Sequence, residues 1–153
     1  MVCLCLIPLW GCDRSVPDAR LRDVFYGHRD DFNKLLTMSE RDRRIARITS
    51  EFATTNVDPG SQANIALSVD QREEYRVLFR KLNIADGLER SPAFPGAVFF
   101  YYHCEGSAVD SDCKGYAYSE KPLAPVAGSL DKMRPGPVFE PLSSNWYLVR
   151  WTT

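Results

Sequence analysis

The sequence predicts an α+β domain in which N-terminal helices pack on one face of a C-terminal antiparallel sheet. Two observations lead to this prediction. Up to about residue 87, apolar residues recur at steps of three and four, which is the spacing of one helix face. From residue 97 on, short aromatic and apolar runs alternate with Gly, Pro and Ser, as strands and turns do. Helices followed by strands are typical of folds with helices on one side of an antiparallel sheet.

The first helix is expected to begin at Pro17 and Asp18, which suit a first helical turn. The spacing predicts one continuous helix to about Met38, with His28 packed on its buried face. The residues of that face are Leu21, Phe25, His28, Phe32 and Leu35.

The segment after this helix allows two interpretations. Residues 39–42 (Ser-Glu-Arg-Asp) resemble a capping signature and predict a short second helix. Either Ile45, Ile48 and Phe52 continue that helix, or residues 48–54 form a strand. Residues 56–64 are expected to form a turn or loop around Pro59 and Gly60.

A second capping signature, Ser68-Val69-Asp70-Gln71, predicts another helix. Its buried stripe consists of Tyr75, Leu78, Phe79 and Leu82. We expect Asp86 and Gly87 to end it.

The C-terminal half predicts four strands. Residues 97–104 and 113–119 have strand composition, and residues 138–142 and 146–152 predict a hairpin that turns at Ser143 and Ser144. Residues 121–137 are rich in Pro and are expected to be irregular.

The five cysteines separate into two groups. Cys3, Cys5 and Cys12 lie near the N-terminus, whereas Cys104 and Cys113 form an even pair. The spacing of this pair does not match usual zinc sites, so we predict a disulfide; a free-thiol or metal role is the alternative.

A disulfide would set the register of a hairpin. It pairs Phe100 with Ala117 on one face and Tyr101 with Tyr116 on the other. The second face is either a core covered by the Pro-rich segment and the last strand, or an exposed binding surface. The residues of that possible binding surface are Tyr101, His103, Tyr116 and Tyr118.

The apolar run at residues 2–8 leads into Leu9-Trp10-Gly11-Cys12, which resembles a bacterial lipobox. The resemblance implies that residues 1–11 are a removed signal peptide, that Cys12 carries acyl chains, that residues 12–17 are a tether and that residues 18–153 form one domain. Because Met1-Val2 lacks a basic side chain, we expect the signal to begin upstream. The alternative is that residues 2–10 form a buried strand or helix.

Residues 114–118 (Lys-Gly-Tyr-Ala-Tyr) and 145–148 (Asn-Trp-Tyr-Leu) are similar to segments of small proteobacterial lipoproteins of unknown function. That resemblance implies a lipid-anchored protein of the cell envelope that faces the periplasm. The choice between inner and outer membrane stays open.

The net charge of −1 argues against a nucleic-acid partner, because nucleic-acid binding requires a basic surface. No nucleophile elbow or phosphate loop is present in the sequence, and we expect neither a metal nor a cofactor. The sequence predicts a protein-binding or envelope accessory module, of which an inhibitor or immunity protein would be an example. The alternatives are a cell-envelope hydrolase that uses His28 with a carboxylate and a carrier of a small ligand.

Overall fold

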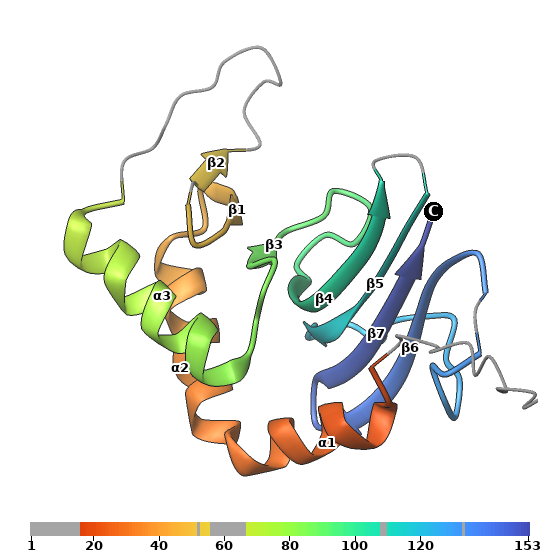
Figure 1. Cartoon of the computed structure of the whole chain (residues 1–153). Coiled ribbons are helices and arrows are strands. Elements are labelled where there is room, and N and C mark those ends of the chain that lie inside the picture. The colour runs from red at the N-terminus through yellow and green to blue at the C-terminus, as the bar shows by residue number, and fades with distance from the viewer. Residues whose placement is uncertain (1–15, 52, 56–66, 108–109, 133) are drawn as a thin grey trace, which may run out of the picture.

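The protein is an antiparallel sheet with helices on one face (Figure 1), as the sequence predicts. The computed structural model describes residues 16–51, 53–55, 67–107, 110–132 and 134–153. Within them, the sheet has seven strands in the order β2-β1-β3-β4-β5-β7-β6. The helices are α1 (Asp18–Gly27), α2 (Arg29–Arg41) and α3 (Val69–Leu82). The strands are β1 (Ile45–Ile48), β2 (Ala53–Thr55), β3 (Leu88–Glu89), β4 (Val98–Ser107), β5 (Asp110–Tyr118), β6 (Gly136–Ser143) and β7 (Trp146–Thr152).

The first predicted helix is interrupted at His28, so the prediction of one continuous helix was wrong. His28 has non-helical dihedrals (φ −132°, ψ 28°), and its N–H bonds to the carbonyl of Phe25 at 3.3 Å. Gly27 weakens a helix by about 1 kcal/mol, and Asp30 and Asp31 favour a new N-terminus at this point. The chain changes direction at this break, and both α1 and α2 lie on the same side of the sheet (Figure 1).

Ser39 does not open a new helix, which corrects the second prediction. Its hydroxyl donates to the carbonyl of Leu36 at 2.8 Å, so residues 39–41 form the last turn of α2. The following segment is extended and not helical, but in place of one strand over residues 48–54 it forms two, β1 and β2, which pair with each other, and β1 also pairs with β3. The loop predicted for residues 56–64 lies outside the described residues.

Helix α3 begins as predicted and ends earlier. Ser68 and Gln71 form both hydrogen bonds of a capping box, at 3.0 and 3.2 Å. The helix ends at Asn83, which adopts the left-handed conformation (φ 56°), and not at Asp86 and Gly87. Asn tolerates this conformation better than most residues, which explains why it ends the helix.

The sheet has a core on each face. All three helices pack on the first face, where Phe32 lies 4.5 Å from the ring of Tyr116 and 5.6 Å from that of Trp146. The second face is covered by loops, with Leu123 of the Pro-rich segment in its core. The covered face therefore fits the interpretation of a second core.

Cys104 pairs directly with Cys113 and His103 with Lys114, as predicted, but the register predicted for the rest of the hairpin, from Tyr102 back to Val98, was wrong. A bulge between Tyr101 and His103 shifts the pairing, so that Tyr101 opposes Gly115 and Phe100 opposes Tyr116. The two strands approach closely here. A Cβ atom added to Gly115 would lie only 2.1 Å from the carbonyl oxygen of Phe100.

None of the helices within the described residues is long and apolar enough to cross a membrane.

Candidate functional site

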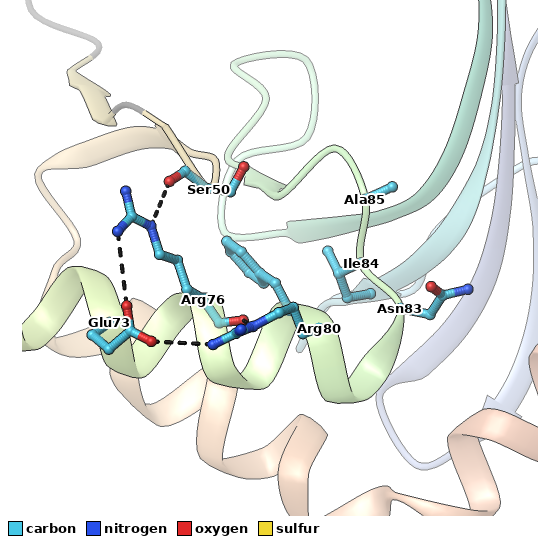
Figure 2. Close-up of a pocket in the computed structure, with 8 residues that line it drawn as sticks. Ser50, Glu73, Arg76, Arg80, Asn83, Ile84 and Ala85 are labelled. Carbon is cyan, nitrogen blue, oxygen red and sulfur yellow. Dashed lines mark hydrogen bonds and ion pairs between the residues drawn. The ribbon is translucent and has the colours of Figure 1, made fainter.

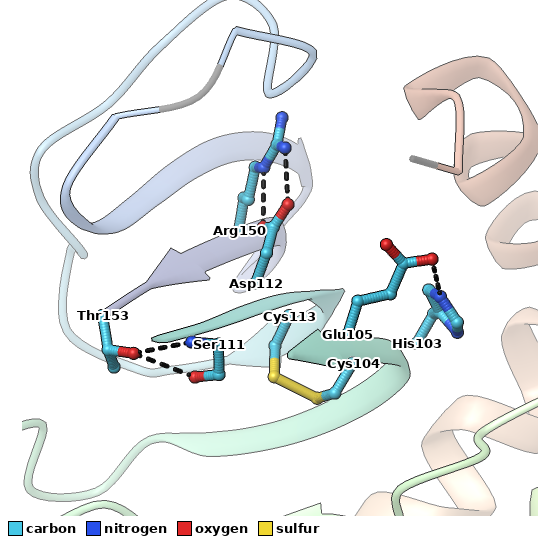
Figure 3. The surroundings of a disulfide bond; sticks show 8 residues. All are labelled: His103, Cys104, Glu105, Ser111, Asp112, Cys113, Arg150 and Thr153. Carbon is cyan, nitrogen blue, oxygen red and sulfur yellow. Dashed lines mark hydrogen bonds and ion pairs between the residues drawn. A yellow bond between two sulfur atoms is a disulfide. The ribbon is translucent and has the colours of Figure 1, made fainter. Parts of the chain in front are cut away.

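The β4–β5 hairpin carries the predicted disulfide. Cys104 and Cys113 are joined across the two strands (Figure 3), and both lie on the loop-covered face of the sheet. Cys12, the predicted lipid attachment residue, lies outside the described residues. The disulfide is therefore the part of the cysteine prediction that the structure confirms.

The four residues of the predicted binding surface do not lie together. Tyr116 is fully buried under the helices, where its hydroxyl donates to the carbonyl of Leu21 at 3.0 Å. Tyr101 is 8% exposed on the opposite face, and Tyr118 packs against the helix-side core. Because the bulge reverses which side chains share a face, only His103 remains at the surface as the prediction requires.

His28 lies at the surface, which corrects the prediction of a packed histidine. Its side chain is 40% exposed, and its Nδ1 lies 3.3 Å from Asp31. Lys81 holds the same carboxylate at 2.8 Å and, through its hydrogen bond, lowers the pKa of Asp31. Among the described residues, His28 lies outside the hollow beside β4 and outside the two hollows beside α3.

Among the described residues, the outer edge of β4 is open beyond Tyr101. The backbone of Tyr101 bonds to that of Gly87 and Asp86, at 2.9 and 3.3 Å, where β3 approaches. Within the described residues, no strand pairs with this edge farther along. The Cα atoms of Cys104 and Cys113 are 4.1 Å apart, the spacing of a non-hydrogen-bonded pair. The N–H and C=O of Cys104 therefore point to the open edge.

The backbone groups of Gly106, two residues beyond Cys104, also point to the open edge. Gly106 pairs with Ser111 two positions beyond the cysteine pair, and backbone groups alternate between the edges of a strand. Gly106 consequently presents a second N–H and C=O to the open edge, and its exposure leaves them accessible. The edge offers two sets of backbone groups to an added strand.

A hollow of about 420 Å³ adjoins this edge on the helix side. His103 and Glu105 line it, and the Nε2 of His103 lies 2.9 Å from the Oε1 of Glu105, with both side chains on the same side of the hairpin (Figure 3). Arg20 of α1 also lines it and is exposed, and its guanidinium forms no ion pair or hydrogen bond with the described residues. The remaining residues that line the hollow are Val16, Asn83, Ala85 and Tyr102.

A second hollow, of about 440 Å³, meets the first at Asn83 and Ala85 (Figure 2). Its charges are already paired, because Glu73 contacts both Arg76 and Arg80, at 3.8 and 3.1 Å. Arg76 also donates to the carbonyl of Ser50 at 2.8 Å. The charge available to a ligand thus lies in the first hollow, at Arg20.

The start of α1 forms one side of the hollow, and a buried lysine holds it in place. Lys114, 4% exposed, donates to the carbonyl of Val16, to Asp18 and to Asp131 at 2.9, 2.9 and 3.0 Å. Asp18 in turn accepts from the N–H of Leu130 at 2.7 Å. These contacts hold the beginning of α1 against the sheet beside the hollow.

Sequence reasoning identified His103 but missed Arg20, Glu105 and the open edge. Arg20 carries no local signal, since an exposed arginine in a first helical turn is unremarkable. The edge depends on strand order, which the sequence does not specify. Within the described part of the chain, no group of three metal-ligating side chains comes together.

Comparisons with protein-family models, with curated proteins and with solved structures found no match to this chain.

Proposed function

We propose that the protein is a lipid-anchored module of the bacterial cell envelope that binds a partner protein at the open edge of β4. Cys12 carries the lipid, and the folded domain faces the periplasm. The partner contributes an extended segment that adds to the sheet as a further strand. An accessory, inhibitory or immunity role is consistent with such a module.

The open edge is the observation that carries the proposal of protein binding. Peptides that add to an exposed sheet edge gain affinity from main-chain hydrogen bonds and specificity from adjacent pockets. The β4 edge has the first feature at Cys104 and Gly106 and the second in the adjoining hollow. An unpaired edge is a liability that proteins commonly cover, which is a reason to expect a partner here.

The proposal of an envelope location has separate support. The lipobox-like residues at 9–12 precede the domain, and a disulfide such as Cys104–Cys113 persists in oxidising compartments. Val16 lines the hollow and lies four residues after Cys12. At about 3.5 Å per residue, the lipid on Cys12 would be at most about 14 Å from the binding site.

Mass spectrometry of the native protein tests the lipid anchor. We expect a chain that begins at Cys12 and carries acyl groups. A chain that retains residues 1–11 with an unmodified Cys12 would contradict this part of the proposal.

Site-specific photo-crosslinking in cells tests the binding edge. A photoreactive residue at Glu105 should give one reproducible crosslinked product, because this position borders both edge and hollow. The matched control is the same residue at Arg44, which is exposed and outside the hollow. No product at position 105, or the same product at both positions, would contradict binding at the edge.

A further inference from the structure

We infer that the segment bound at the β4 edge alternates acidic and apolar side chains, with an acidic side chain paired to Arg20. This inference rests on the proposed strand addition and specifies its partner. It follows from the different chemistry of the two faces that meet at this edge.

The alternation follows from strand geometry. Successive side chains of a strand point to opposite faces of the sheet. A segment added beside β4 would place the side chains opposite His103 and Glu105 over the hollow. Those opposite Cys104 and Gly106 would lie on the disulfide side. Each residue type in the segment therefore meets one kind of surface.

The hollow favours an acidic side chain. Glu105 already has a side-chain partner in His103, at 2.9 Å, which leaves the Arg20 guanidinium as the charged group without a partner among the described residues that line the hollow. Guanidinium pairs with carboxylate through two parallel hydrogen bonds. Tyr102 and Asn83, two residues with hydrogen-bonding side chains, also line the hollow.

The opposite face favours an apolar side chain. Cys104 and Cys113 are half-buried there and pack against the second core together with Trp151. Tyr101 continues this surface along β4. An apolar residue placed beside the disulfide would cover sulfur and aromatic surface, whereas a charged residue would lose hydration without a partner.

Two synthetic hexapeptides, both with blocked ends, test the inference on the full mature chain. One alternates Val and Glu, and the other alternates Val and Lys. We expect the Glu peptide to bind up to about fivefold more tightly than the Lys peptide, which is what one exposed ion pair provides. Arg20→Glu should reverse this preference. Arg44→Glu, the same charge change outside the hollow, should leave it unchanged.

Amide hydrogen exchange separates this inference from the proposed function. Binding by strand addition should slow exchange at Cys104 and Gly106. One contrary result is that the two peptides protect these amides equally, and another is that the preference is unaffected by Arg20→Glu. Either result would contradict the inference of an acidic segment, but it would not contradict strand addition. No protection with either peptide would overturn strand addition itself. Protection that rises with protein concentration alone would assign the edge to a second copy of this chain and overturn the inference.

Discussion

Lys114 shows how a single residue connects the start of the chain to the sheet. On β5 it lies directly opposite Arg150 of β7, and two like charges in that position would be unfavourable alone. Carboxylates compensate both, because Asp18 and Asp131 contact Lys114 while Asp112 pairs with Arg150 at 2.6 Å. The cluster is a structural element that positions Val16 and Arg20 beside the hollow.

Replacing Lys114 with Met should destabilise the fold strongly. Asp18 has a side chain 3% exposed and would remain charged and buried without its cation. Breaking a buried pair in this way costs about 3–5 kcal/mol. Urea unfolding measures the loss, with Lys121→Met at an exposed position as the control, for which we expect less than about 0.5 kcal/mol. Equal stabilities of the two variants would contradict a structural role for the cluster.

The β4–β5 hairpin is the element that determines the candidate site. Its bulge places Tyr102 and His103 toward the helix side, and its length carries β4 beyond the end of β3. The disulfide constrains the part of the hairpin that has no neighbour on the outer side. The edge is thus rigid before any partner arrives, which reduces the entropy lost on binding.

Removal of the disulfide should lower the free energy of unfolding by about 2–3 kcal/mol, as expected for closing a short loop; the two cysteines are separated by 9 positions. Cys104→Ala with Cys113→Ala tests this in urea unfolding. Peptide binding at the edge should weaken in the same variant, because the edge strand then loses its constraint. Unchanged stability would show that the disulfide contributes nothing to the hairpin.

At the scale of the whole molecule, stability should depend on pH at both extremes. Lys81 lowers the pKa of Asp31, and Lys114 lowers the pKa of Asp131, through hydrogen bonds to each carboxylate. Both carboxylates have an ordinary value of 3.8. The stability they confer is complete above that value and is lost as pH falls through the lower native pKa.

The alkaline side has the opposite sign. Burial raises the pKa of Tyr75, Tyr101 and Tyr116 above the ordinary value of 10.0. The unfolded chain then loses these protons first, so the free energy of unfolding falls as pH rises above about 10. Urea unfolding from pH 3 to pH 11 should show losses at both ends, and Asp31→Asn with Asp131→Asn should flatten the acid side. An acid side unaffected by these two changes would contradict the assignment.

The sequence predicted those features that depend on neighbours along the chain. The capping box at Ser68, the stripe from Tyr75 to Leu82 and the turn at Ser143 all follow from local spacing. The direct pairing of Cys104 with Cys113 followed from an even pair of cysteines between strands. The break at His28 was missed because the apolar spacing continues through it from Phe25 to Phe32, although Gly27 and the two aspartates after His28 favour a break there.

The sequence by itself determined the α+β class, the helix and strand content of the two halves and the disulfide hairpin, because these depend on periodicity and composition. Only the tertiary structure decided the bulge beside Tyr101, the open edge beyond it and the hollow that Arg20 completes. Strand order and the packing of α1 against β5 join residues far apart in the chain. No local pattern specifies such contacts, and so the candidate site was visible only in the folded molecule.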